Sequence, residues 1–134
     1  MTKILLVEDN EMNRDMLSRR LVRKGHEIVL AVDGAECLEL ARSGQPDVIL
    51  MDMSLPLITG WEATRILKGD AATKWIPIIG LTAHALSKSH DEAMQAGCDE
   101  FETKPVNLER LLEKIEILVT ASALRKGESG NPLP

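Results

Sequence analysis

Five polar residues in this 134-residue chain lie at the ends of predicted strands, most of which are short apolar runs, and together they suit phosphate chemistry. They are Glu8, Asp9, Asp52, Thr82 and Lys104. Three carboxylates suit a hard divalent cation such as Mg²⁺, while a hydroxyl and an ammonium suit the oxygens of a phosphoryl group. Apolar runs of this length are typical of buried parallel strands, and open parallel sheets bind ligands at the carboxyl ends of their strands. The five side chains are therefore expected at one edge of a sheet.

Strands and helices are predicted to alternate along the whole chain. The expected strands cover residues 3–7, 27–31, 48–51, 78–81 and 100–103. The first expected helix covers residues 11–24, with Asn10 as its N-cap and Gly25 as its stop, and the second carries Cys37, Leu38 and Ala41 on one face and ends at Gly44. The third follows Gly60 and has Ala63, Ile66 and Leu67 on its inward face. The fourth covers residues 88–96 and is ended by Gly97, and the last has apolar residues at helical spacing from Leu108 to Val119. Helical spacing also predicts core packing for Met12, Met16 and Met94.

Five strands that alternate with five helices predict a doubly wound α/β fold with a five-stranded parallel sheet. Of the two strand orders common in such sheets, 2-1-3-4-5 suits a chain of this size. Residues 1–122 are expected to form one domain. The segment 123–134 is expected to be a disordered tail, because it is rich in Gly and Pro.

The composition argues against several classes of function. A formal charge of -5 disfavours a nucleic-acid surface. No apolar run approaches the length of a membrane span, and the first residues lack the form of a signal peptide. Cys37 and Cys98 are far apart and have no metal-binding spacing, so they are expected to be reduced thiols of a cytoplasmic protein.

Five motifs in this order resemble the receiver domain of two-component response regulators. They are Leu5–Asn10, Leu50–Pro56, Gly60, Leu81–Ala83 and Thr103–Pro105. Each motif alone is weak, but the resemblance extends over residues 3–120. It implies that Asp52 accepts a phosphoryl group and that the protein is not a multiple-turnover enzyme, since it would catalyse only its own phosphorylation and dephosphorylation.

The resemblance also implies roles for the other site residues. Mg²⁺, or Mn²⁺ in its place, would be held by Asp9 and Asp52, by the backbone carbonyl of Ser54, and by Glu8 directly or through water. Thr82 and Lys104 would bind phosphoryl oxygens. Thr82 and Phe101 would form a conformational switch, and the Lys104–Pro105 peptide bond would be cis.

The implied partners are a histidine kinase, a histidine phosphotransfer protein, or both. A downstream protein target would dock on the face formed by the helix 88–96, the strand 100–103 and the last helix. Direct contact with nucleic acid or membrane is not expected.

Two other classes of protein share parts of this pattern. Aspartate-nucleophile phosphohydrolases have a second Asp two residues after the nucleophile as general acid, but Ser54 occupies that position here. Flavin-binding carriers of similar topology need a Ser/Thr/Gly-rich phosphate loop after the first strand, whereas Glu8–Glu11 is acidic. Phosphatase activity on a chromogenic phosphoester, compared with labelling by acetyl phosphate, separates an enzyme from a receiver.

Overall fold

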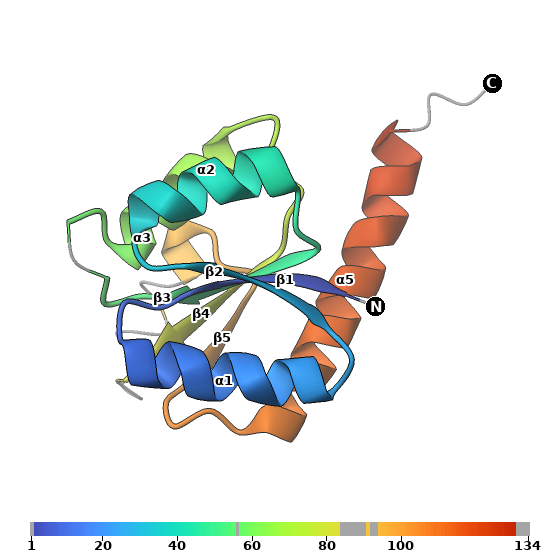
Figure 1. Cartoon of the computed structure of the whole chain (residues 1–134). Helices are drawn as coiled ribbons and strands as arrows, with labels where there is room; N and C mark the ends of the chain where they lie inside the picture. Colours follow the sequence, from blue (N-terminus) through green and yellow to red (C-terminus); the bar gives the residue numbers. More distant parts are fainter. Residues whose placement is uncertain (1, 56, 84–90, 92–93, 131–134) are drawn as a thin grey trace.

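The computed structural model describes residues 2–55, 57–83, 91 and 94–130, and a five-stranded parallel sheet forms its centre (Figure 1). The strands are β1 (Lys3–Val7), β2 (Glu27–Ala31), β3 (Val48–Asp52), β4 (Ile78–Thr82) and β5 (Glu100–Thr103), in the order β2-β1-β3-β4-β5. The helices are α1 (Glu11–Arg23), α2 (Gly34–Gly44), α3 (Gly60–Gly69) and α5 (Leu108–Gly130). The predicted doubly wound α/β fold and its strand order are confirmed.

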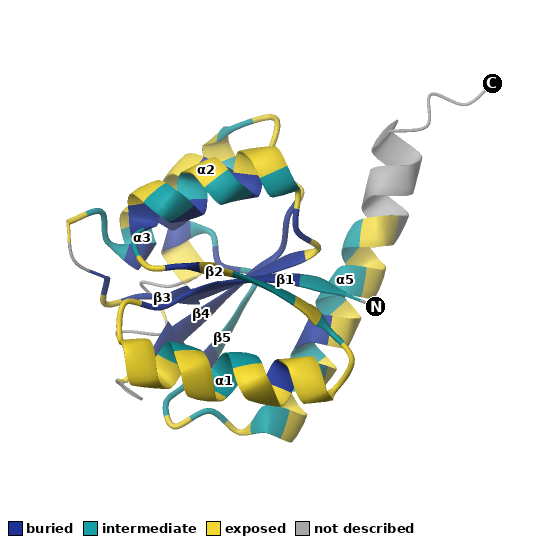
Figure 2. Ribbon diagram, in the orientation of Figure 1, coloured by how far each residue is buried: buried dark blue, intermediate teal, exposed yellow. Residues whose placement is uncertain are grey.

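Helices cover both faces of the sheet, and alternate residues of β1 contact one helical layer or the other. Leu5 and Val7 pack with residues of α2 and α3, whereas Ile4 and Leu6 pack with residues of α1 and α5. Figure 1 shows these two helix pairs on opposite sides of the sheet, and Figure 2 shows that the central strands between them are buried. Burial on both faces explains why the central strands are nearly continuous apolar runs. Within the described residues, no helix is long and apolar enough to span a membrane.

The parallel register brings the carboxyl ends of the strands to one edge of the sheet. Val7 of β1 lies beside Met51 of β3, and Thr82 of β4 lies beside Thr103 of β5. Residues that follow these positions therefore lie along a common edge, as the sequence pattern predicted.

Both predicted ends of α1 are confirmed. The side chain of Asn10 accepts a hydrogen bond from the backbone N–H of Asn13 at 2.9 Å, as an N-cap residue does. Gly25 has a φ of +89°, a conformation that residues with a Cβ rarely adopt, and it ends the helix two residues after Arg23.

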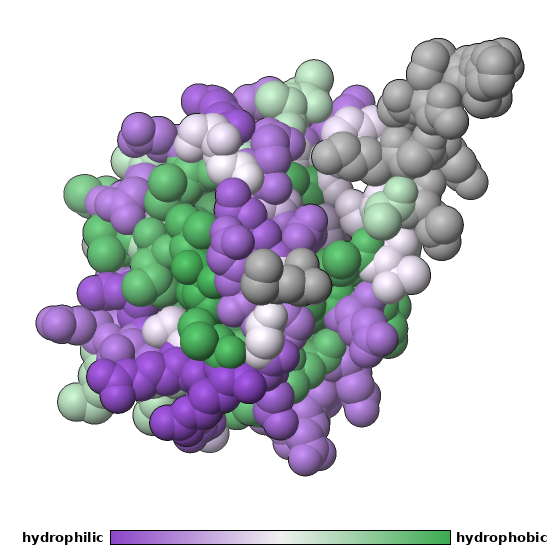
Figure 3. Space-filling model, turned by 45° about the vertical axis from the view of Figure 1, so that its right-hand side comes forward, coloured by the Kyte–Doolittle hydropathy of each residue, from purple (hydrophilic) through white to green (hydrophobic). Residues whose placement is uncertain are grey.

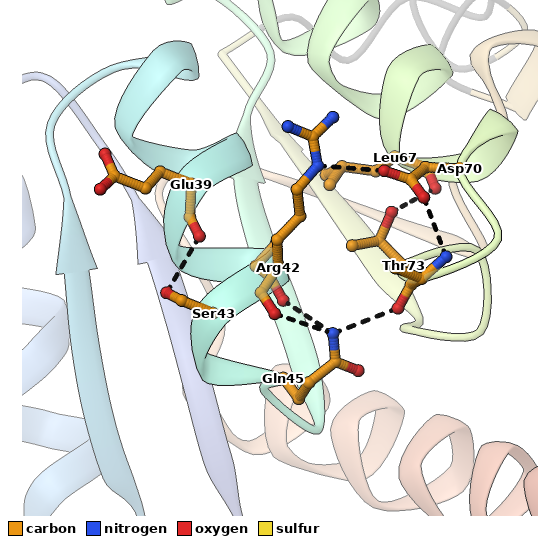
Figure 4. Close-up of polar contacts among 9 residues, drawn as sticks. Glu39, Arg42, Ser43, Gln45, Leu67, Asp70 and Thr73 are labelled. Carbon is orange, nitrogen blue, oxygen red and sulfur yellow. Dashed lines mark hydrogen bonds and ion pairs between the residues drawn. The ribbon is translucent and has the colours of Figure 1, made fainter.

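The end of α2 is formed by Gln45 rather than by a glycine in the left-handed conformation. Gly44 is the last helical residue, and Gln45 takes a φ of +43°. Its amide Nε2 donates to two carbonyl oxygens of α2 and, at 3.2 Å, to the carbonyl of Ala72 beyond α3 (Figure 4). Arg42 Nε donates to Asp70 Oδ2 at 3.0 Å in the same group of contacts. These polar contacts hold the end of α2 against the end of α3.

Four side chains expected in the core are exposed, so this part of the sequence analysis is wrong. Ile66 is 42% exposed because the buried face of α3 is formed by Gly60, Ala63, Thr64 and Leu67, and one residue corresponds to a rotation of about 100° around a helix. Met12 is 76% exposed, and Met16 and Met94 are exposed too. The prediction failed because helical spacing alone does not say which face of a helix turns to the core. Figure 3 shows that hydrophobic residues form part of the surface on one face of the molecule.

The last helix is longer than its apolar period. The period ends at Val119, but α5 continues to Gly130 and so replaces the expected disordered tail over residues 123–130. Residues 121–126 include Ala, Leu, Arg and Lys, which favour helix, whereas Gly127 and Gly130 near its end do not. The domain boundary at residue 122 stays a prediction. The expected helix 88–96 lies mostly outside the described residues, of which 91 and 94–96 are helical.

The first residue of α3 lies directly against the end of β3. A Cβ atom at Gly60 would lie 2.5 Å from the carbonyl oxygen of Asp52 and 2.6 Å from the Cα of Met53. Both are backbone atoms, so they cannot move aside as a flexible side chain would. The absence of a side chain at Gly60 therefore determines how closely α3 approaches Asp52.

We expect Gly60→Ala to lower the free energy of unfolding by about 1 to 3 kcal/mol, the usual cost of overpacking. Gly69→Ala is the matched control, because a Cβ there would meet no atom within 4 Å. The control should be neutral or slightly stabilising, as alanine favours helix. Urea denaturation of the two variants measures the difference, and equal stabilities would contradict the proposed close contact.

Candidate functional site

The strand ends bring all five polar residues of the initial pattern to one edge of the sheet. Glu8 and Asp9 follow β1, Asp52 ends β3, Thr82 ends β4, and Lys104 follows β5. Carboxylate oxygens of Glu8, Asp9 and Asp52 lie within 4.8 Å of one another. Glu8 and Asp52 are only 4% and 2% exposed, whereas Asp9 is exposed. The site is thus a partly buried acidic cluster with one open side.

Lys104 supplies the positive charge of the cluster. Its Nζ lies 3.1 Å from Glu8 Oε1 and 3.4 Å from Asp52 Oδ2. Its backbone N–H donates to the carbonyl of Thr82 at 2.7 Å, which ties this residue to the end of β4. The Lys104–Pro105 peptide bond is cis, as the sequence analysis expected.

Ser54 binds the second oxygen of Asp52. Its backbone N–H and its hydroxyl both donate to Asp52 Oδ1, at 3.0 and 2.9 Å. Only the backbone carbonyl of Ser54 was predicted to contribute to the site, and these two donors were not predicted. An available signal was the Asp-x-Ser spacing, because Asp side chains often accept from the backbone N–H two residues on.

Thr82 and Phe101 lie on neighbouring strands next to this site. Thr82 is buried at the end of β4. Phe101 lies on β5, is half-buried, and packs against the core cluster on the α2–α3 side of the sheet. The two residues predicted to form a switch are therefore on adjacent strands, with Thr82 at the acidic edge.

The family model for the response regulator receiver domain matches residues 4–116, which is most of the chain. The chain belongs to the response regulator receiver domain family. The chain is also similar to the polar-differentiation response regulator DivK of Brucella ovis, with 38% identity over 117 residues that cover 87% of this chain and 95% of the relative.

Solved receiver structures have the same fold. The receiver domain of the sensor histidine kinase PA1611 from Pseudomonas aeruginosa, described with a magnesium ion coordinated in its active-site cleft, matches with a TM-score of 0.83 and 33% identity, covering 89% of this chain and 98% of the other. A chain from the co-crystal structure of the Saccharomyces cerevisiae phosphotransfer protein Ypd1 with the receiver domain of Ssk1 matches with a TM-score of 0.79 and 30% identity, covering 85% and 86%.

Burial and neighbouring charges shift the pKa values of Glu8 and Asp52, the two buried carboxyl groups of this receiver domain, in opposite directions. Burial raises the pKa of Glu8 to about 7, the adjacent Asp52 adds to the shift, and Lys104 opposes it. For Asp52, burial alone would raise the pKa, but contacts with Glu8, with the two Ser54 donors and with Lys104 bring it below its usual value. Asp52 is therefore ionised at neutral pH, and Glu8 is the carboxyl group that holds a proton below about pH 7.

The acidic cluster has the donor set of a magnesium site. Glu8 Oε2 is buried, and no donor among the described residues reaches it. A buried carboxylate close to two others is stabilised by binding either a proton or a cation. Three carboxylates are also the hard oxygen ligands that Mg²⁺ prefers. The residues present therefore fit a divalent cation.

A pocket of about 400 Å³ opens beside Lys104. It lies between α1 and the segment that connects β5 to α5, and its lining is mainly apolar, with Met16, Leu17, Pro105 and Val106 among its residues. The acidic site therefore adjoins an apolar recess that is large enough to receive side chains of another protein.

A charged group behind the site was not predicted from the sequence either. Glu102 on β5 is buried and forms ion pairs with Arg110 and Lys114 of α5. The available signals were an acidic residue inside a short strand and two basic residues four positions apart on the following helix, which share one helix face.

We expect the stability of the protein without divalent cations to fall as pH rises from about 4.5 to about 7, through the contribution of Glu8. The folded protein holds the Glu8 proton more tightly than the unfolded chain, so this contribution is complete below the unfolded pKa and lost as pH passes the folded one. Glu8→Gln should reduce the slope of melting temperature against pH in this range. Glu113→Gln, an exposed residue of α5, is the control. An unchanged slope in Glu8→Gln would contradict the raised pKa.

Proposed function

We propose that this receiver domain is a phosphorylation-dependent signalling switch that accepts a phosphoryl group on Asp52. The observation that carries the proposal is the environment of this side chain. Asp52 is ionised, its Oδ1 is held by Ser54, and its Oδ2 faces Lys104. A carboxylate kept ionised and oriented by fixed donors is prepared to act as a nucleophile.

The proposed transfer is a simple displacement. A carboxylate oxygen of Asp52 attacks phosphorus, and the bond from phosphorus to the donor atom breaks. The electron pair of that bond stays with the leaving group, which departs as acetate when acetyl phosphate is the donor and as an imidazole, able to take a proton from solvent, when the donor is a phosphohistidine. Lys104 and the Thr82 hydroxyl are proposed to bind phosphoryl oxygens, because both side chains lie at the end of the sheet beside Asp52.

The proposed cofactor is Mg²⁺, for which Mn²⁺ can substitute. Asp9, Asp52 and the backbone carbonyl of Ser54 would hold it, and Glu8 would contribute directly or through water. When bound, the ion neutralises charge on the phosphoryl oxygens during transfer. The protein residues supply the remaining functions, namely the nucleophile, its orientation by Ser54 and the ammonium of Lys104.

We expect acetyl phosphate and Mg²⁺ to add one phosphoryl group to the parent protein and none to Asp52→Asn, which keeps the shape of the side chain but is not a nucleophile. Asp15→Asn, which changes an exposed carboxylate of α1, should be labelled like the parent. Intact-protein mass spectrometry gives the result. Labelling of the Asp52→Asn variant at another residue would refute the assignment of the acceptor.

We expect Mg²⁺ to raise the melting temperature, because a ligand that binds only the folded state stabilises it by about 2.7 kcal/mol at a hundred times its Kd. Asp9→Asn should remove most of this response. Glu11→Gln, an exposed acidic residue two positions later, should keep it. Thermal denaturation over a Mg²⁺ titration makes the comparison. A parent protein whose melting temperature does not change with Mg²⁺, or an Asp9→Asn variant whose melting temperature rises as much as that of the parent, would count against this metal site.

The proposed donors are a histidine kinase, a histidine phosphotransfer protein, or both. Support comes from the two structural relatives, one the receiver domain of a sensor histidine kinase and the other from a complex between a phosphotransfer protein and a receiver. The apolar pocket beside Lys104 offers such a partner a contact surface next to Asp52. Repeating the labelling with a histidine-phosphorylated phosphotransfer protein as donor tests this class of partner. The proposed place of action is the cytoplasm, which cell fractionation would check.

A turnover phosphohydrolase is the alternative that shares most of these groups. Such an enzyme needs a proton donor for its leaving group near the nucleophile. The residue at the relevant position is Ser54, whose hydroxyl donates to Asp52 rather than toward an incoming substrate. Receiver domains are in general signalling switches, so the family and the residue at position 54 both favour the switch.

We propose that Thr82 and Phe101 transmit phosphorylation to the face formed by β5, α5 and the segment 88–96, which would bind the downstream target. A phosphoryl group on Asp52 would attract the Thr82 hydroxyl, and the half-buried Phe101 ring would occupy the space behind it. Amide chemical shifts with and without beryllofluoride, a phosphoryl mimic, should change across residues 83–107. Changes confined to the acidic site would disprove this relay.

A further inference from the structure

A buried carboxylate links the strand that carries Lys104 to the last helix. Glu102 on β5 is 2% exposed. Its Oε1 accepts from Arg110 Nε at 2.9 Å and from Nη2 at 2.6 Å, and its Oε2 lies 2.9 Å from Lys114 Nζ. Burial alone would raise the pKa of Glu102, but the two basic groups bring it below its usual value. This carboxylate is therefore charged and held by two residues of α5.

The ion pair between Glu102 and Arg110 joins the two ends of the segment that connects β5 to α5. Between these two residues lie Lys104 and the cis Pro105. Inside the same segment, Asn107 caps α5 by accepting from the backbone N–H of Arg110 at 3.0 Å. The loop that carries Lys104 is thus fixed at the strand end by Glu102 and at the helix end by Arg110.

The position of Lys104 depends on the shape of this loop. Its Nζ reaches Glu8 and Asp52 across the end of the sheet, from an edge strand to the central strands β1 and β3. Lys114 adds a second constraint on β5, since it donates to the carbonyl of Phe101 at 2.6 Å. A change in the distance between β5 and α5 would therefore move the base of the Lys104 side chain.

We propose that Glu102 is a positioning residue for phosphoryl transfer, and that its ion pair with Arg110 holds the β5–α5 loop in the shape that places Lys104 beside Asp52. The inference rests on the proposed function, because it assigns Lys104 a role in transfer to Asp52. A positioning role explains why residue 102, which is buried, carries a charge. A buried ion pair contributes little net stability, and an apolar residue of similar size often serves equally well for folding. What the pair supplies is a fixed, two-nitrogen contact between Arg110 and the carboxylate.

The test compares variants that break the ion pair with variants that only weaken the fold. Glu102→Gln removes the charge and keeps the shape, and Arg110→Gln removes the other partner, whose side chain is 55% exposed, while Lys114 still pairs with Glu102. Arg110→Lys keeps the charge without the two-nitrogen contact. Ile115→Val removes one buried methylene from α5 and serves as the control for stability. Glu113→Gln serves as the control for surface charge.

The first measurement is the rate of labelling by acetyl phosphate at saturating Mg²⁺. We expect Glu102→Gln and Arg110→Gln to lose about tenfold, since a shift of ~1 Å in a catalytic group can cost up to about 100-fold. Arg110→Lys should recover part of the loss. The Kd for Mg²⁺ should not weaken, because Lys104 is not one of the proposed metal ligands. The two control variants should keep the rate of the parent.

The second measurement is the pair of ¹⁵Nζ and ¹³Cε chemical shifts of Lys104, which can be recorded on the unphosphorylated protein. Both ion-pair variants should move this signal toward that of an exposed lysine, and both controls should leave it in place. An unchanged Lys104 signal or an unchanged labelling rate in the ion-pair variants would overturn the proposal. A rate loss that Ile115→Val matches would overturn it as well, as that would be an effect of stability alone. A parent protein that is not labelled at all would instead contradict the proposed function, while the Lys104 signal would still decide whether Glu102 positions this side chain.

Discussion

Repulsion among three carboxylates at one edge of the sheet is the constraint on which the rest of this structure depends. Two like charges ~4 Å apart repel by about 4 kcal/mol at an effective dielectric constant of 20, and burial of Glu8 and Asp52 removes most of the water that would reduce this repulsion. The protein tolerates the cluster through two compensations. Lys104 lies between the two buried groups, and Glu8 holds a proton up to about pH 7. A divalent cation would replace both compensations at once, so the same repulsion that weakens the metal-free fold favours metal binding.

The doubly wound fold supplies this arrangement because it brings residues distant in sequence to one line. The two acidic positions after β1 and the one that ends β3 come from adjacent strands, whereas Lys104 reaches them from beyond the edge strand β5. Rigid surroundings then prevent the carboxylates from moving apart. Ser54 holds one oxygen of Asp52, and Gly60 allows α3 to begin directly on the backbone of the same residue. The functional residues are thus placed by backbone geometry, and their side chains need little freedom of their own.

The sequence allowed prediction of the features that depend on local pattern. Apolar runs gave the strands and their ends, and polar residues at those ends gave the acidic site with Lys104. Features that depend on the three-dimensional direction of a side chain were missed. Met12 and Ile66 have helical spacing but lie on exposed faces, because spacing does not identify which face meets the sheet. The extension of α5 beyond Val119 was missed because a search for apolar periodicity does not detect a helix without an apolar face, and Gly127 and Gly130 do not favour helix either. For the contact of Glu102 with α5, the sequence offers the basic pair Arg110 and Lys114 on one helix face, but whether that face meets β5 depends on how the strand and the helix pack.

Addition of a phosphoryl group to Asp52, as proposed, would shift the electrostatic balance at this edge. The acceptor would exchange one negative charge for about two, carried on oxygens that extend toward the open side of the site. Lys104 would then be drawn more strongly toward Asp52 than toward Glu8. The loop that carries Lys104 runs between β5 and α5, which are joined by the ion pairs of Glu102 with Arg110 and Lys114. The added force would therefore act on the contact between β5 and α5. The proposed switch of Thr82 and Phe101 would give one route from the site to that surface, and Lys104 with its anchored loop would give a second. Both routes meet on β5, where Lys114 holds the carbonyl of Phe101, so β5 is the element in which the two effects of phosphorylation would combine.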